Sequence, residues 1–332
     1  MERGKKMQAF VWEEGEYKVK EMEDPTFEKD EVVVNLKTAG LNRRDLSISK
    51  QLGEDKPALI IGSDGAGIIE AIGSAVKDVK VGDEVIVNPS LRWEKKSDAP
   101  PASFDILGKP DHGTLAGKIV LSENQVEPKP SDLSWEEAGV LALAGLTGYR
   151  ALVTKGEISE GQTVFIPGAG SGAATFMIQF AKAKGAKVIV SSRSKEKQEA
   201  AVQLGADKAI DTEADWQEEL QEETIDLVID SVGRATFNRS LGILKKGGRI
   251  VIFGATAGDI AEVNLRAFFY GQYQLFGSTM GSREELQEML GFIKKHEIRP
   301  VLGKVFSLEE AKDAFRMLEE NVQFGKLAIT LP

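Results

Sequence analysis

The sequence predicts an α/β protein that combines a β-rich domain with a doubly wound parallel sheet. Its 332 residues are too many for one ordinary domain and sufficient for two. Up to about residue 129, short β-type runs such as "EVVVNLKTAG" and "DEVIVNP" are separated by Gly- and Asp-containing turns. From Thr163 onward, strand-like and helix-like segments alternate, as in a parallel sheet with helices on both faces.

These patterns divide the chain into three consecutive segments. Residues 1–129 form the first part of the β-rich domain, and residues 130–298 form the domain with the parallel sheet. Residues 299–332 have the pattern strand, helix, strand. We expect this last segment to return to the first domain, because nothing in it marks a third domain.

Helices and loops are indicated by their start signals and composition. Ser134 followed by Glu137 fits a capping box at the start of a helix. Residues 93–114 are polar, contain Pro100-Pro101 and are expected to form a loop. Further helices are expected near residues 173–184, 195–203, 234–244 and 282–296.

Composition excludes several classes of function. The net charge of −10 and the pI near 5.1 argue against nucleic acid as a partner. No run approaches the roughly 20 apolar residues of a membrane helix, and the start "MERGKKMQAF" lacks the apolar stretch of a secretory signal. We therefore expect a cytoplasmic protein without a membrane partner.

The absence of cysteine limits metal and thiol chemistry. Without cysteine the chain has no disulfide, no catalytic thiolate and no Cys-based zinc site. Its two histidines, His112 and His296, are far apart in the sequence. We interpret His112 as structural, with a proton-donating role as the alternative, and His296 as a partner of a helix dipole.

A glycine-rich turn after the strand at 163–166 predicts a dinucleotide site. Small residues allow a pyrophosphate to approach the backbone, and the N-terminus of the following helix offers unpaired N–H groups. Gly168, Gly170 and Ala173 satisfy the pattern G-x-G-x-x-G/A, and the strand after the helix supplies the βαβ context. The predicted pyrophosphate-binding residues are Gly168, Ala169, Gly170, Ser171, Gly172, Ala173 and Ala174.

The end of the next strand predicts which dinucleotide binds. An acid that would bind the ribose hydroxyls is expected near Ser191, Ser192 and Arg193, but no carboxylate stands there. An arginine guanidinium donates two parallel hydrogen bonds to a 2′-phosphate, serine hydroxyls also donate to it, and Lys197 lies nearby in the sequence. The pattern therefore favours NADPH over NADH. Alternatively, Arg193 and Lys197 only form a solvated helix start.

Taken together, the motifs resemble those of the medium-chain dehydrogenase/reductase superfamily, on its zinc-independent, quinone oxidoreductase-like side. The resemblance extends from about Met7 to the C-terminus. It rests on "AGLNRRDLSI", "IIGSDGAGIIEAIG", "EEAGVLALAGLTGYRAL", "IPGAGSGAATFMIQFAKAKGAKVI", "DLVIDSVG", "LKKGGRIVIFGATAG" and "GKLAITL". It implies a GroES-like β-rich catalytic domain formed by both chain ends, a Rossmann domain between them and a cleft where the two meet. It also implies a homodimer joined at the Rossmann sheet edge, here residues 272–281.

The resemblance also shows where zinc-dependent relatives carry their ligands. Asn42 stands where those relatives have a cysteine, and Ser63-Asp64 where they have a His-Glu pair. The remaining ligand matches a place within Leu143–Gly145, where no side chain binds metal. We therefore expect no metal ligands and no bound zinc, although similarity alone would suggest a zinc-type alcohol dehydrogenase.

Candidate catalytic and nicotinamide-side residues follow from matched motifs and strand ends. Asn42 is expected to donate a hydrogen bond to the acceptor carbonyl, Arg43 or Arg44 to stabilise developing charge, and Asp45 to orient them. Thr147 matches a residue near the nicotinamide in relatives. Strand ends, where such sheets bind ligands, supply the further cofactor candidates Val232, Gly233, Phe253, Gly254 and Ala255.

These expectations converge on an NADPH-dependent oxidoreductase that reduces a small quinone, enone or activated carbonyl by hydride transfer without zinc. Two alternatives remain open at this point. One is a catalytically weak NADPH-binding protein with a sensing or structural role. The other is a zinc alcohol dehydrogenase, which the lost ligand positions disfavour.

Overall fold

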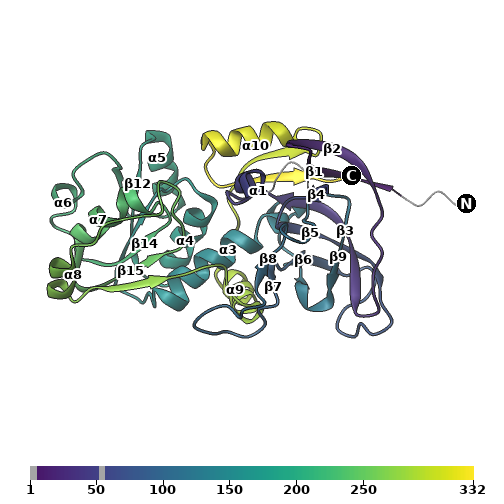
Figure 1. The fold of residues 1–332 in the computed structure, drawn as a ribbon. Helices are drawn as coiled ribbons and strands as arrows, with labels where there is room; N and C mark the ends of the chain where they lie inside the picture. Colours follow the sequence, from purple (N-terminus) through teal and green to yellow (C-terminus); the bar gives the residue numbers. More distant parts are fainter. Residues whose placement is uncertain (1–5, 52–56) are drawn as a thin grey trace, which may run out of the picture. The chain divides into compact units, whose positions relative to one another are not determined.

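The structure is a computed structural model that describes residues 6–51 and 57–332 (Figure 1). The chain forms two compact units: Met1–Ala144 with Gly281–Pro332 is unit 1, and Gly145–Met280 is unit 2. Residues 130–144 and 281–298, which the sequence assigns to the second domain, thus fall in unit 1; the exact domain limits stay a prediction. Residues 1–5, which include Arg3 and Lys5 of the basic chain start, lie outside the described residues.

Unit 1 is built on β-sheets. The largest has the order β10-β6-β5-β3-β18-β17, with β9 also pairing with β3; β2-β1-β4 and β7-β8 form two smaller sheets. The strands are β1 Lys6–Glu13, β2 Glu16–Glu23, β3 Glu31–Gly40, β4 Leu59–Ile60, β5 Asp64–Ile72, β6 Glu84–Val87, β7 Ser90–Leu91, β8 Asp105–Ile106, β9 Lys118–Ser122, β10 Val126–Pro128, β17 Leu302–Ser307 and β18 Lys326–Thr330.

The C-terminal strand β18 completes this sheet. It pairs antiparallel with β3, where Ala328 lies opposite Gly40, and parallel with β17. Buried residues from both ends of the chain share one apolar core, which includes Phe10, Ile48 and Phe315. The helices of this unit include α1 Asp45–Gln51, α2 Trp135–Gly139, α9 Arg283–His296 and α10 Ala311–Glu320.

Helix α9 belongs to unit 1, and its first residue forms two hydrogen bonds with other residues of that unit. The Arg283 backbone N–H donates to the Trp93 carbonyl at 2.8 Å, and its Nε donates to Glu127 Oε1 at 2.6 Å. Trp93 itself is buried, within the segment that the sequence treats as a loop. That segment also contains the short strand β8. It is therefore a loop with one element of regular structure, and its first residue is held by burial of the Trp93 side chain.

Unit 2 is a parallel sheet with the order β13-β12-β11-β14-β15-β16. From the central strand β11, the next two strands along the chain, β12 and β13, are added on one side of the sheet. Strands β14, β15 and β16 are then added in turn on the other side. Right-handed crossovers therefore place α4 and α5 on one face and α7 and α8 on the other (Figure 1). The elements are β11 Thr163–Pro167, α4 Gly172–Ala183, β12 Lys187–Ser192, α5 Lys195–Leu204, β13 Lys208–Asp211, α6 Trp216–Glu219, β14 Ile225–Asp230, α7 Arg234–Ile243, β15 Leu244–Ile252, α8 Leu265–Gly271 and β16 Gln274–Gly277.

Local sequence signals explain several element boundaries. The predicted capping box at Ser134 and Glu137 is present at the start of α2. Ser171 caps α4 by accepting the Ala174 N–H, and Ser194 caps α5 in the same way. Strand β11 is buried along its whole length, as expected for a central strand covered by helices on both faces.

Helix α3, Ala142–Tyr149, continues into a π-helical turn, Arg150–Lys155, before β11 begins. Within residues 6–51 and 57–332, no helix is long and apolar enough to cross a membrane. The cytoplasmic location expected from the sequence stays a prediction.

Candidate functional site

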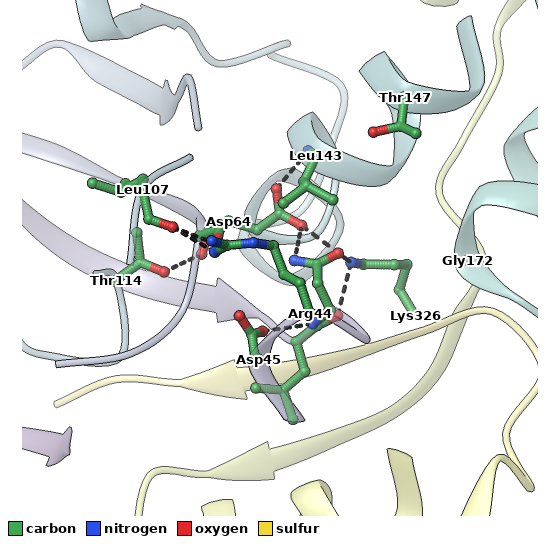
Figure 2. Close-up of polar contacts among 12 residues, drawn as sticks. Arg44, Asp45, Asp64, Leu107, Thr114, Leu143, Thr147, Gly172 and Lys326 are labelled. Carbon is green, nitrogen blue, oxygen red and sulfur yellow. Dashed lines mark hydrogen bonds and ion pairs between the residues drawn. The ribbon is translucent and has the colours of Figure 1, made fainter. Parts of the chain in front are cut away.

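The polar centre of unit 1 is a buried cluster of Asn42, Asp64 and Lys326 (Figure 2). Lys326 lies on β18 and donates from Nζ to Asn42 Oδ1 at 2.5 Å and to Asp64 Oδ2 at 3.1 Å. The Asn42 Nδ2 donates to the same Asp64 oxygen at 2.9 Å. Asp64 is fully buried and Lys326 is 3% exposed, so the two form a buried ion pair. The side-chain amide of Asn42 forms hydrogen bonds with both partners of this pair.

Further hydrogen bonds hold Asp64 in this position. Its second carboxylate oxygen, Oδ1, accepts the Leu143 backbone N–H at 2.6 Å. Its backbone carbonyl accepts the Thr114 hydroxyl at 2.6 Å. Asp64 begins β5, Leu143 lies on α3 and Thr114 precedes β9, so three distant segments are tied to one carboxylate (Figure 2).

The two arginines of "NRRD" have different surroundings. Arg44 Nη1 donates to Ser63 Oγ at 2.6 Å and to the Leu107 carbonyl at 2.8 Å, and burial lowers the pKa of this guanidinium. Arg43 is exposed and donates from Nη1 to the Leu318 carbonyl at 2.9 Å. The structure therefore brings Arg44 next to the cluster and places the guanidinium of Arg43 on α10; a catalytic role for either stays a prediction.

Asp45 is fully buried at the start of α1. Its Oδ2 accepts the Asn42 backbone N–H at 2.8 Å, which fixes the turn that carries Asn42. Burial raises the pKa of Asp45 to about 6, against the opposing effect of the neighbouring Arg44. Asp45 therefore positions the backbone of Asn42; its expected role in orienting the catalytic side chains stays a prediction.

The positions that match zinc ligands converge on this cluster but do not fit a metal. Both polar atoms of the Asn42 amide are engaged within the protein, and Leu143 presents an apolar side chain. The third matched residue, Asp64, is paired with an ammonium group. In the described part of the chain, no group of three or more His, Cys, Asp and Glu residues is placed to hold a metal ion.

The two histidines have structural partners. His112 Nδ1 accepts the Ile60 backbone N–H at 3.1 Å, and burial lowers the pKa of this imidazole. His296 ends α9, and its ring lies 4.4 Å from that of Phe292, measured between centroids. Both therefore serve the fold, and the interpretation of His112 as structural agrees with its contact.

In unit 2 the glycine turn has the geometry of an anion site at a helix N-terminus. Gly168 has φ +82°, which an L side chain rarely adopts, and its backbone N–H donates to the Ser191 carbonyl. The first N–H groups of α4 have no acceptor within the helix. Ser171 Oγ accepts the third of them, from Ala174, and leaves those of Gly172 and Ala173 for a ligand.

The end of β12 offers hydroxyl groups and positive charge but no carboxylate. Ser191 is fully buried and its hydroxyl accepts from Thr212, whereas Ser192 Oγ accepts the Ser194 N–H. Arg193 is exposed and, within the described residues, makes no hydrogen bond or ion pair. The side chain of Lys197 lies over Gly170, where an added Cβ would be 2.6 Å from Lys197 Cδ. Whether these residues bind the 2′-phosphate of NADPH stays a prediction.

The ends of β14 and β15 are held together by a buried aspartate. Asp230 Oδ1 accepts the N–H groups of Val232 and Gly233, and the Phe253 N–H donates to its carbonyl. Gly233 has φ +87°, and a Cβ there would lie 2.7 Å from the Gly258 carbonyl oxygen. The predicted cofactor residues at these strand ends, including Gly254 and Ala255, are thus neighbours at the carboxyl edge of the sheet.

Thr147 lies on α3 within the same unit and is 9% exposed. Its hydroxyl contacts the Met280 sulfur at 3.7 Å. A contact of Thr147 with a nicotinamide stays a prediction.

A GroES-like β domain together with a Rossmann sheet and its glycine turn defines the class of dehydrogenases and reductases that use pyridine nucleotides. Residues 28–131 match the family "Alcohol dehydrogenase GroES-like domain", and residues 172–295 match "Zinc-binding dehydrogenase". The chain belongs to the medium-chain dehydrogenase/reductase superfamily and is an oxidoreductase of that family. The fold class predicted from the sequence is confirmed.

Curated relatives and solved structures resemble the chain over most of its length. It is 32% identical to the zinc-type alcohol dehydrogenase-like protein YogA of Leptosphaeria maculans, covering 91% of each chain. It is also 32% identical to a crotonyl-CoA reductase of Streptomyces avermitilis, covering 83% of this chain and 68% of the relative.

Two solved structures share the fold. One is an NAD-dependent alcohol dehydrogenase, 34% identical, with a TM-score of 0.91 over 98% of this chain and all of that one. The other is the 2-octenoyl-CoA carboxylase reductase CinF, in complex with NADP and 2-octenoyl-CoA. It is 25% identical, with a TM-score of 0.88 over 98% of this chain and 88% of that one.

Sequence reasoning missed two residues that organise these sites. Lys326 appears in the sequence only as part of "GKLAITL", and nothing local reveals that its ammonium reaches residues 262 and 284 positions earlier. Asp230 ends a buried strand and stands three residues before Gly233, which is a weak signal for a loop-ordering carboxylate. Asp64 was noticed only as a lost metal ligand, whereas it is the anion of a buried pair.

Proposed function

We propose that this protein is an NADPH-dependent reductase of activated carbonyl compounds, such as enones, enoyl thioesters or quinones. The observation that carries the proposal is the end of β12, where the exposed guanidinium of Arg193 stands without a carboxylate nearby in the strand end. A relative named for the reduction of crotonyl-CoA and a neighbouring structure complexed with NADP support it. The NAD-dependent neighbour shows that the family also uses the other cofactor.

The residues of unit 2 fit the cofactor. The N–H groups of Gly172 and Ala173 would bind the pyrophosphate, and Gly168 supplies the backbone conformation that keeps the turn open. Arg193 and Lys197 would bind the 2′-phosphate through charge-assisted hydrogen bonds. When bound, NADPH supplies a hydride to the electrophilic carbon of the acceptor and leaves as NADP.

The residues of unit 1 act on the acceptor's oxygen. Hydride addition to the β-carbon of an enone moves an electron pair onto the carbonyl oxygen, and a proton from water then completes the saturated product. Asn42 donates a hydrogen bond to the oxygen as its negative charge develops, which lowers the barrier without a metal. Asp45 keeps the backbone of Asn42 in place.

The test is a comparison of cofactors followed by a panel of acceptors. Saturating NADPH is expected to raise the melting temperature more than NADH does, since a ligand at a hundred times its Kd stabilises by about 2.7 kcal/mol. Oxidation of NADPH is then followed with a quinone, an enone, crotonyl-CoA and an aldehyde. Absence of turnover with all four refutes the reductase and favours an NADPH-binding protein without catalysis.

Arg193→Asp tests the cofactor assignment. Loss of one charge-assisted contact of roughly 1.5–3 kcal/mol lowers NADPH affinity about ten- to a hundred-fold and leaves NADH affinity unchanged or improved. Lys195→Asp is the matched control, because it makes the same change of charge at an exposed position two residues away. Equal losses in both variants, or an NADH preference in the unaltered protein, contradict the assignment.

The protein is further proposed to be a homodimer joined at the free edge of the Rossmann sheet. Strand β16 is the edge strand on that side of the sheet, so within the described residues its outer N–H and C=O groups are not paired with another strand. Large apolar side chains are exposed on this strand and around α8: Leu275 on β16, Leu265, Phe269 and Tyr270 on α8, and Ile260 before α8. A second copy of the chain would pair its β16 with this one and cover both sets of side chains.

A further inference from the structure

The ammonium of Lys326 is the buried cation at the place where relatives with zinc hold their metal. It contacts Asn42 Oδ1, Asp64 Oδ2 and the Leu41 carbonyl at 2.5, 3.1 and 2.8 Å. Asn42 and Asp64 stand at matched ligand positions, and the third matched segment reaches the cluster through the Leu143 N–H. The same segments that would surround a metal therefore surround an amine (Figure 2).

This arrangement permits only one orientation of the Asn42 amide. Its oxygen accepts from an ammonium group, which has no acceptor, and its nitrogen donates to a carboxylate, which has no donor. A flipped amide would place nitrogen against ammonium and oxygen against carboxylate, and both contacts would be repulsive. One hydrogen of Nδ2 is used by Asp64, and the second has no acceptor among the residues that the structure describes.

The amide donor is also polarised by its neighbour. A cation at the amide oxygen draws electron density from the nitrogen, so the remaining N–H becomes a stronger donor in a low-dielectric surrounding. Such a preorganised donor is worth most where negative charge develops during a reaction.

We propose that Lys326 is a positioning residue that acts through Asn42. Its ammonium fixes and polarises the amide, whose second N–H donates to the acceptor's carbonyl oxygen. This inference rests on the proposed reductase function for the identity of that oxygen. The fixed orientation of the amide is independent of turnover.

Lys326→Met removes the cation while retaining most of the side-chain volume. We expect kcat for the acceptor that the wild type reduces to fall about 100-fold, the loss typical of one donor to a developing oxyanion, with little change in the KM for NADPH. Lys129→Met is the matched control, since Lys129 is also a buried lysine of unit 1 that pairs with a carboxylate, Glu84. It is expected to lower the melting temperature without lowering kcat.

The combination with Asn42→Ala separates a positioning role from a structural one. If Lys326 acts through the amide, the double variant Asn42→Ala/Lys326→Met loses no more activity than the more damaged single variant. Lys326→Arg keeps the positive charge and is expected to recover part of kcat. Independent, multiplying losses, or wild-type kcat in Lys326→Met, overturn the proposal.

A readout without catalysis distinguishes failure of the inference from failure of the proposed function. The side-chain NH₂ signals of Asn42 are identified in an amide NMR spectrum as the pair missing from Asn42→Ala. In the wild type we expect two well-separated proton shifts and slow exchange with water; in Lys326→Met, exchange quickens at least tenfold. Unchanged exchange overturns the inference even if the enzyme is active. If the protein reduces no acceptor but Lys326→Met shows the faster exchange, the proposed reductase function is refuted and the inference about Lys326 stands.

Discussion

The replacement Asp45→Asn probes a carboxyl group that folding places where its charge is unfavourable. Asp45 is fully buried; one carboxyl oxygen accepts the Asn42 N–H, and the other has no hydrogen-bond partner among the described residues. Asparagine has nearly the same shape and keeps an acceptor for that N–H, but it carries no charge. The variant therefore isolates the effect of ionisation.

The magnitude follows from the pKa of this group. Burial raises the pKa from 3.8 to about 6; Arg44 and Lys326 oppose the rise and Asp64 adds to it. Because the folded state binds the proton more tightly than the unfolded state, the free energy of unfolding falls as pH increases between about 4 and 6. At about 1.4 kcal/mol per pKa unit, the rise from 3.8 to about 6 means that ionisation of Asp45 costs about 3 kcal/mol of stability at pH 8; the cost is small at pH 4, where the folded protein keeps the proton.

Urea unfolding at several pH values measures this difference. Unit 1 contains Trp12, Trp93 and Trp135, so a Trp216→Phe background confines the fluorescence signal to that unit. Asp45→Asn is expected to be about 3 kcal/mol more stable than this background at pH 8, with the gain shrinking towards pH 4.

A surface aspartate provides the control. Asp83 Oδ2 accepts a backbone N–H from three residues earlier, as Asp45 does, but at an exposed turn. Asp83→Asn makes the same replacement where the carboxylate is solvated, and it should not give the gain of about 3 kcal/mol at pH 8. Parallel pH curves for Asp45→Asn and its background, or lower stability of Asp45→Asn at pH 8, would refute the reasoning.

Three further outcomes follow from unit 2. Ser171→Ala removes the cap of α4, so it should lower the free energy of unfolding by about 1 kcal/mol and weaken NADPH binding. Asn264→Ala removes the cap of α8 and is the control: thermal melting should show a similar loss of stability, and titration with NADPH should show unchanged affinity. Gly233→Ala should destabilise by about 2–4 kcal/mol because its Cβ meets backbone atoms; Gly247→Ala, with a similar φ and open space, should lose only about 1 kcal/mol. Leu275→Lys should convert the dimer to a monomer in sedimentation velocity, and an unchanged sedimentation coefficient would contradict the proposed edge.

Unit 2 could be predicted closely from the sequence because its signals are local. The helix expected near 173–184 is α4, Gly172–Ala183, and the helix expected near 195–203 is α5, Lys195–Leu204. Periodicity, a capping serine and a glycine turn all act within a few residues of the element that they define. The absence of an acid after β12 is likewise visible without knowledge of the fold.

The polar cluster of unit 1 could be predicted only in part, because contacts that are distant in the sequence define it. Asn42 was identified by its place in a motif, but its partners Asp64 and Lys326 come from the start of β5 and from the last strand. Arg43 and Arg44 are adjacent in sequence and equal in charge. Only the packing of α10 and of the loop before β9 decides which guanidinium lies beside the cluster.

The interruption of unit 1 by unit 2 has a consequence for synthesis on the ribosome. Residues 145–280 are contiguous, so unit 2 can fold while the chain is still growing. Unit 1 has to wait for β18, and the Asp64 carboxylate stays without its cation until residue 326 has been added. A nascent chain stalled or truncated shortly before that lysine would therefore display a finished nucleotide-binding domain beside an unfinished catalytic one.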